Sequence, residues 1–136
     1  MHTDVLDYRM SRMVDLPYKD VVERTRQELA KEGFGVLTEI DVMGTLKTKL
    51  NADFRPYVIL GACNPSMAHR ALTAEPDIGV LLPCNVVIYA ADAPGRTVVS
   101  AVDPETSLAR VGNDALRPVA ADVKARLRRV LDRVAG

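Results

Sequence analysis

The sequence contains no tryptophan, and its 18 basic and 18 acidic residues leave a formal net charge of zero. Proteins that bind nucleic acid normally carry a basic excess, because much of their affinity comes from neutralising phosphates. Aromatic residues make up only 4% of the chain, which does not favour a platform on which bases stack. These features predict that nucleic acid is not among the partners.

Long apolar runs are also missing. The first ten residues, MHTDVLDYRM, contain acidic side chains and no apolar stretch, so they do not resemble a secretory signal. The longest apolar stretches, such as VVIYAA at 86–91, are too short to span a bilayer. No GxGxxG motif or phosphate-binding loop is present. We therefore expect a cytoplasmic protein without a membrane span, in which thiols stay reduced.

The chain does contain enough apolar residues to form a hydrophobic core. Its 136 residues are 48% hydrophobic, a composition typical of a globular protein that needs no disulfide or metal to fold. We predict one domain over residues 1–136, with residues 1–5 frayed at the terminus.

Alternating apolar residues predict strands, and apolar residues at helical spacing predict helices. The predicted strands cover residues 6–14, 34–42, 55–63, 79–91 and 96–102. The predicted helices cover residues 17–32, 43–51 and 65–73, with a last one that begins at Asp114. The order β-α-β-α-β-α-β-β-α predicts an α+β fold, with helices packed on one face of a mainly antiparallel sheet. Pro83 marks a bulge, an edge or the true start of its strand.

Several long blocks resemble one prokaryotic family. They are GFGVLTEIDV at 33–42, FRPYVILGACNP at 54–65, EPDIGVLLPCNVVIY at 75–89 and LRPVAADVKARLRRVL at 116–131. The family is the domain of unknown function numbered three hundred and two, and the resemblance runs from about Val14 to the end of the chain. It implies a compact α+β domain that forms a homodimer. The family has no agreed activity, so the resemblance implies no reaction.

Both cysteines precede an asparagine, and His69 lies between the two pairs. Cys63 follows a predicted strand and precedes a helix that Asn64 caps, where backbone N–H groups favour a thiolate. If the two strands run antiparallel, Cys63 and Cys84 approach each other. Together with His69 they offer two thiolates and an imidazole to a soft metal such as zinc or copper(I). The candidate cofactor is thus a soft transition metal or haem, and no cofactor is the default.

The same residues also fit a purely structural role. Unpaired cysteine is among the most buried residue types and packs as a small apolar side chain. The spacing of Cys63, His69 and the distant Cys84 is not that of a zinc finger. Both interpretations stay open on the sequence alone.

Two acidic residues form a second candidate. Glu39 and Asp41 are two apart on a predicted strand and therefore share a face, where two carboxylates would raise one another's pKa. The simpler interpretation is that both point to water, with Lys47 and Lys49 as ion-pair partners. Asn85 is a third candidate, because a polar side chain inside an apolar strand needs a hydrogen-bond partner if it is buried.

Three functional hypotheses follow. The first is a small ligand- or metal-binding accessory protein, whose pocket is formed by Cys63, Asn64, His69, Cys84 and Asn85, with Glu39 and Asp41 at its rim. The second is a thiol-dependent redox or transfer catalyst that uses Cys63, with His69 as its base. The third is a structural dimerisation module without a small-molecule site. Whether the protein is an enzyme is left open by the sequence.

Overall fold

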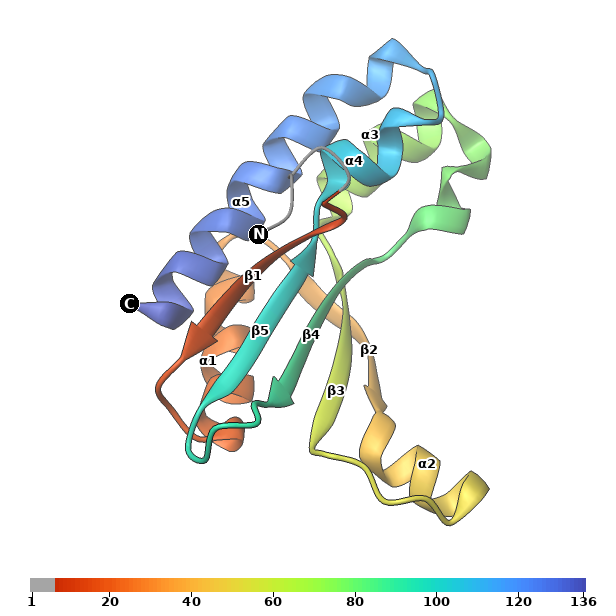
Figure 1. The fold of residues 1–136 in the computed structure, drawn as a ribbon. Coiled ribbons are helices and arrows are strands. Elements are labelled where there is room, and N and C mark those ends of the chain that lie inside the picture. Colours follow the sequence, from red (N-terminus) through yellow and green to blue (C-terminus); the bar gives the residue numbers. More distant parts are fainter. Residues whose placement is uncertain (1–6) are drawn as a thin grey trace.

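Strands and helices alternate along the chain and form one antiparallel sheet with helices packed against one face (Figure 1). This computed structural model describes residues 7–136. The strands are β1 (Arg9–Val14), β2 (Gly35–Asp41), β3 (Tyr57–Cys63), β4 (Cys84–Ala90) and β5 (Thr97–Val102), and they lie in the order β1-β5-β4-β3-β2. The helices are α1 (Tyr18–Lys31), α2 (Val42–Leu50), α3 (Pro65–Ala74), α4 (Pro104–Ala109) and α5 (Arg117–Ala135), with 3₁₀ turns η2 (Pro76–Leu81) and η3 (Asp114–Leu116). The predicted α+β class is confirmed.

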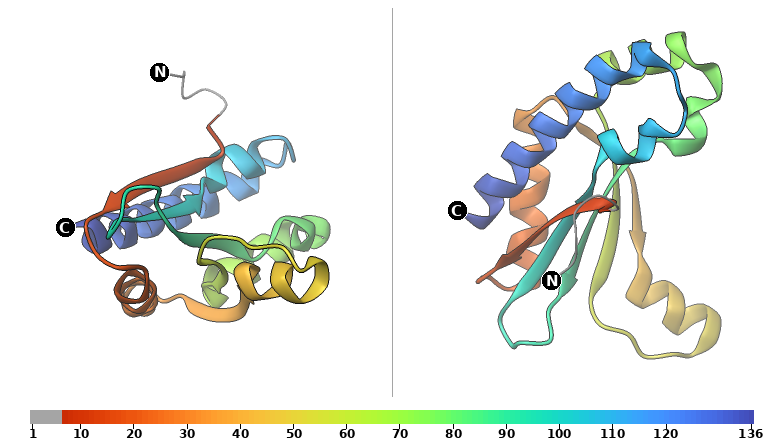
Figure 2. Two further views of the ribbon diagram at one scale, coloured as in Figure 1. Left: turned by 60° about the horizontal axis from the view of Figure 1, so that its bottom comes forward. Right: turned by 45° about the horizontal axis from the view of Figure 1, so that its top comes forward.

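The core lies between one face of the sheet and the helices. Residues opposite one another on neighbouring strands share a face, and one such row runs through Ala101, Val86 and Leu60, all almost fully buried. α1 and α5 pack side by side on this face (Figures 1 and 2). The apolar stripe predicted for the last helix is buried at Val119, Ala120, Val123, Leu127, Val130, Leu131 and Val134. Burial of this stripe ties the helices to the sheet.

The other face of the sheet carries no helix within residues 7–136 (Figure 2). Its side chains follow from the pairing of the strands, and we call them the open face: Arg9, Ser11, Met13, Thr38, Ile40, Tyr57, Ile59, Gly61, Asn85, Val87, Tyr89, Val98, Ser100 and Val102. Arg9 is the one charged residue in this set, and Met13 and Ile40 are each 47% exposed, whereas Val98 and Ser100 are buried. The open face is therefore an uncovered and largely apolar surface.

Gly61 occupies a crowded place on the open face. A Cβ atom at this residue would overlap the Thr38 hydroxyl and lie 2.8 Å from Cγ of Pro83. The two neighbouring side chains thus close over the backbone of β3, and only glycine fits between them.

The start of β4 and the segment after β5 differ from the sequence prediction. The strand predicted over 79–91 begins only at Cys84, because residues 76–81 form η2, so Pro83 marks the true start of the strand. The predicted connector after residue 103 contains α4, whose first turn is capped by Asp103 through bonds from two backbone N–H groups. The last helix, predicted to begin at Asp114, starts there as the short turn η3, which Asn113 caps, and α5 itself begins at Arg117. Leu6, predicted in the first strand, lies outside the described residues.

A bulge in β2 changes which side chains share a face. Val36 pairs with Ala62, but Thr38 pairs with the next residue, Gly61, so Leu37 is extra in the ladder. Val36 and Thr38, although two residues apart on the strand, therefore point to opposite faces. Val36 packs against the core, whereas Thr38 and Ile40 belong to the open face.

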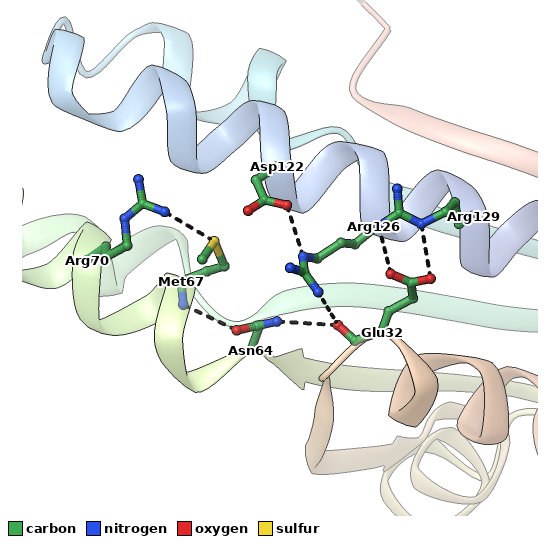
Figure 3. A network of polar contacts seen from close by, with 7 residues as sticks. All are labelled: Glu32, Asn64, Met67, Arg70, Asp122, Arg126 and Arg129. Atoms are coloured by element: carbon green, nitrogen blue, oxygen red, sulfur yellow. Dashed lines mark hydrogen bonds and ion pairs between the residues drawn. The ribbon is translucent and has the colours of Figure 1, made fainter.

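Glu32, the residue after α1, joins three helices. Its carboxylate accepts hydrogen bonds from Arg129 Nε and Nη2 at 3.0 and 2.8 Å and from Arg133 Nη1 at 2.7 Å. Its backbone carbonyl accepts bonds from Arg126 Nη1 at 3.0 Å and Asn64 Nδ2 at 3.4 Å (Figure 3). Glu32 is only 7% exposed, so these contacts tie the end of α1 to α5 and to the start of α3.

The hydrogen bond from Arg129, with that from Arg133, lowers the pKa of Glu32 from 4.5 to about 2, against the opposing effect of burial. Because the folded-state pKa is depressed, this stabilisation is present above about pH 4.5 and is lost as the pH falls towards 2. We expect Glu32→Gln to lower the free energy of unfolding by about 1–3 kcal/mol at pH 7. Urea unfolding at pH 7 and pH 3 measures this.

Glu23→Gln is the matched control, because Glu23 lies exposed on the same helix. It should change the free energy of unfolding little at either pH. The difference in the free energy of unfolding between the Glu32→Gln variant and the parent should be smaller at pH 3 than at pH 7. A difference that stays constant with pH would contradict the role assigned to Glu32.

Candidate functional site

A small apolar cavity of about 50 Å³ lies where β3 ends and β4 begins, under α3, α4 and α5. It is built from the segments that contain both Cys-Asn pairs. Its lining residues are Phe34, Ala62, Cys63, Asn64, Met67, Ala68, Ala71, Leu82, Pro83, Cys84, Pro104, Leu108, Val119, Ala120 and Val123. Apart from Asn64 and the two thiols, these side chains are apolar.

Cys84 is the first residue of β4 and pairs with Ala62 on the core side of the sheet. Burial, followed by the neighbouring Cys63, raises the pKa of the Cys84 thiol from 9.0 to about 11. The neutral thiol is therefore strongly favoured at pH 7, and Cys84 is a poor nucleophile unless a metal displaces its proton.

Cys63 and Asn64 stand at the junction of β3 and α3. The Asn64 side chain accepts a bond from the Met67 backbone N–H at 3.2 Å, so the predicted N-cap is present. Cys63 is half-buried and not disulfide-bonded. Cys63, Asn64 and Cys84, three of the candidate residues from the sequence, all line the cavity.

Met67 is a lining residue that the sequence did not mark as functional. It lies one turn into α3, is 8% exposed, and adds a thioether to the two thiols of the cavity wall. The Arg70 guanidinium lies 3.8 Å from its sulfur (Figure 3). The sequence signal that could have pointed to Met67 is its position three residues after the helix cap at Asn64.

His69 does not join the thiols. It lines a different, shallow hollow between α3 and the start of the last helix, together with Arg70, Ala115 and Val119. Within residues 7–136 there is no cluster of three or more histidine, cysteine, aspartate or glutamate side chains that could hold a metal ion. The sulfur-containing residues that line the cavity are Cys63, Met67 and Cys84.

The two acidic candidates lie apart from the cavity. Glu39 pairs with Arg26 of α1, and Asp41 caps α2 by accepting a bond from the Gly44 N–H at 3.1 Å. Lys47, which the sequence suggests as an ion-pair partner of these acids, instead pairs with Asp53. Asp41 also contributes to a raised pKa of Tyr18, after the larger effect of burial.

Asn85 also lies apart from the cavity. It pairs with Gly61 on the open face and is exposed to solvent, so it needs no buried hydrogen-bond partner. Consecutive strand residues point to opposite faces, which separates Asn85 from Cys84. The two Cys-Asn pairs are therefore not equivalent: the first asparagine caps a helix, and the second belongs to the open face.

The fold and the cavity define a class: a small α+β domain with a five-stranded antiparallel sheet, one open sheet face and a cavity lined by sulfur and apolar side chains. No helix among the described residues is long and apolar enough to cross a membrane. The family model "Domain of unknown function DUF302" matches residues 10–134. The chain belongs to the DUF302 family, as its sequence blocks indicate.

A solved structure supports the same assignment. The crystal structure of an uncharacterized conserved DUF302 protein from Bacillus stearothermophilus is 34% identical in sequence and superposes with a TM-score of 0.87. The similarity covers 94% of this chain and 98% of that one. No curated protein matches the sequence.

The raised pKa of Cys84 has a direct kinetic consequence. We expect Cys84 in the native protein, distinguished from Cys63 by peptide mapping, to react with iodoacetamide about 100-fold more slowly at pH 7 than in the unfolded chain, because the thiolate is the reactive form. The rate should keep rising above pH 9, as expected for a pKa of about 11. Mass spectrometry of the native and denatured protein measures both rates. A native rate that levels off near pH 8 would contradict the assigned pKa.

Proposed function

We propose that this protein is a small ligand- or metal-binding accessory protein, and that the cavity at the β3–β4 junction is its binding site. The observation that carries the proposal is the cavity of about 50 Å³ with Cys63, Cys84 and Met67 in an otherwise apolar wall. A preformed apolar cavity with a few polar or polarisable groups is typical of a ligand site.

The size of the cavity limits what it accepts without movement. About 50 Å³ holds a metal ion or a few heavy atoms. A neighbouring hollow of about 270 Å³, which contains Asn113 and Arg117, shares Leu108 and Ala120 as walls with the cavity. Movement of these two side chains would join the two spaces, so a ligand with an apolar end and a polar end fits this arrangement best.

The sulfur groups favour a soft metal over a hard one. Thiolate and thioether ligands suit copper(I), whereas calcium and magnesium require oxygen ligands. Deprotonation of Cys84 by a bound metal would overcome its raised pKa.

The test of binding combines mass and elemental analysis with a cavity-filling variant. We expect anaerobically purified protein to carry a ligand or metal in native mass spectrometry, and Ala68→Leu to abolish it. Ala68 is half-buried in the cavity wall, so the larger side chain fills the space at little cost to the core. The bound species should also raise the melting temperature of the parent protein.

Ser66→Leu is the matched control, because it adds an apolar side chain to an exposed position of the same helix. It should keep the ligand. The binding function would be contradicted if the purified protein carries neither ligand nor metal and if the parent protein and the Ala68→Leu variant melt at the same temperature. Rapid alkylation of Cys63 in such protein would favour thiol chemistry instead.

We also propose that the protein acts as a homodimer through its open face. Two rows of this face, one from Met13 to Tyr57 and one from Ser11 to Ile40, contain no charged side chain. Arg9, on the next row, pairs with Asp7, and Arg55, over the Tyr89 ring, pairs with Asp92, so two copies can meet without burying unpaired charges. Tyr57 and Tyr89 stack at 5.1 Å on this surface, and aromatic residues of this kind are enriched in interfaces.

A charge on the open face should separate the dimer. We expect Ile40→Glu to shift the sedimentation coefficient from that of a dimer to that of a monomer, because the carboxylate would be buried in the interface. Ile40 is 47% exposed in the single chain, so the substitution should leave the fold intact. Leu72→Glu, at a residue 42% exposed on α3, is the control and should remain dimeric. Dimers of both variants would contradict the proposed interface.

A further inference from the structure

Arg70 is an exposed arginine of α3 that forms no ion pair with a carboxylate among the described residues. Most arginines in this part of the chain do form such pairs, as Arg12 does with Asp132. The polar contact of the Arg70 guanidinium is a weak one, from Nη1 to the sulfur of Met67 at 3.8 Å. In Figure 3 this guanidinium extends from α3 towards α5, apart from the arginines that contact Glu32. Most of its five N–H donors are therefore available to a ligand.

Arg70 lines a shallow hollow of about 340 Å³ between α3 and the start of the last helix, which we call the Arg70 hollow. This volume lies within the range of small-molecule sites, about 300–1,000 Å³. The lining residues are His69, Arg70, Thr73, Ala74, Ala115 and Val119. Two of them are basic and none is acidic, although the chain as a whole has no net charge.

The acidic residues that follow α3 and open the last helix have partners outside the Arg70 hollow. Glu75 accepts a hydrogen bond from Asn113 Nδ2 at 3.0 Å, and Asp114 pairs with Arg117. Neither carboxylate lines the hollow. Because no carboxylate in the wall competes for the basic groups, the hollow favours an anionic ligand.

The available donors indicate which kind of anion fits. The Thr73 hydroxyl donates to the His69 carbonyl at 2.7 Å, so the side-chain donors left for a ligand are the Arg70 guanidinium and the His69 imidazole. The guanidinium fork binds two oxygens of an oxyanion at once. A carboxylate has no further oxygen, whereas a phosphate monoester has a third one for an imidazole N–H. The pair therefore suits a phosphate better than a carboxylate.

We infer that the Arg70 hollow is a second binding site, which takes a small organic phosphate. Arg70 and His69 bind the phosphate, and Ala74, Ala115 and Val119 form an apolar wall for the organic group. This site goes beyond the proposed function, because neither basic residue lines the cavity at the β3–β4 junction.

Phenyl phosphate is a suitable probe, because it joins a phosphate to a small apolar ring. We expect it to bind the full chain at one site in isothermal titration calorimetry, and Arg70→Gln to raise the dissociation constant at least about tenfold, since a charge-assisted contact is lost. Arg70→Lys keeps the charge but not the fork, so its dissociation constant should lie between those of the parent and Arg70→Gln.

Arg128→Gln is the matched control, because it removes the same charge at an exposed position of α5 outside the hollow. It should leave the dissociation constant within about twofold of the parent. Neither substitution changes a buried residue, so both variants should melt at the temperature of the parent protein. Ala68→Leu, which fills the cavity at the β3–β4 junction, should also keep phenyl phosphate binding.

The outcomes separate this site from the cavity. Loss of binding in Arg70→Gln alone would support the Arg70 hollow, whether or not the cavity holds a ligand. Phenyl phosphate that does not bind the parent at millimolar concentrations, or that Arg70→Gln and Arg128→Gln weaken equally, would overturn it. Binding that Ala68→Leu abolishes would overturn it too, and phenylacetate that binds as tightly as phenyl phosphate would overturn the assignment of a phosphate.

Discussion

The helical layer of this protein depends on one residue, Glu32. Its side chain is held by two arginines of α5, and its backbone carbonyl accepts from a third arginine and from Asn64. A buried carboxylate is stable only when it is paired and fully hydrogen-bonded, and a removed partner would leave a costly unpaired charge. The apolar stripes of α1 and α5 supply most of the burial, but they allow sliding along the helix axes. The contacts of Glu32 fix where α1 ends, where α3 begins and which turn of α5 faces them.

The cavity is a consequence of that fixed arrangement. Because Asn64 both caps α3 and donates to Glu32, the start of α3 is held in one position, and Met67 and Ala68 project over the ends of β3 and β4. The space that remains between α3, α4 and α5 is bounded by small residues, such as Ala71 and Ala120, which do not fill it. Cys63, Met67 and Cys84 therefore all line one apolar cavity at the end of β3 and the start of β4. The open face, by contrast, is a broad and largely apolar surface, with Arg9 in one row and the Arg55 guanidinium over Tyr89.

Local sequence signals predicted most of the fold. The α+β class, the antiparallel sheet, the stripe on α5 and the cap at Asn64 all follow from periodicity and capping chemistry. The approach of Cys63 and Cys84 was also predictable, because it needs only two antiparallel strands. Other features depend on tertiary contacts. The bulge at Leu37 reverses the alternation of β2, and no single-residue signal marks it. The place of His69 depends on the rotation of α3, which the capped Asn64 and the packing of Met67 determine together.

Gly61 limits the number of ways in which the sheet can assemble. Antiparallel strands can slip by two residues and still keep the same side chains on the same face, so hydrophobic pattern alone does not choose between registers. A slip of β3 by two would place Ile59 or Cys63 between Thr38 and Pro83, where no Cβ atom fits. Steric exclusion at Gly61, by Thr38 of β2 and by Pro83 just before β4, thus selects the native pairing. The absence of a side chain at Gly61 therefore specifies the alignment of β2, β3 and β4, and the last two of these strands carry the cysteines.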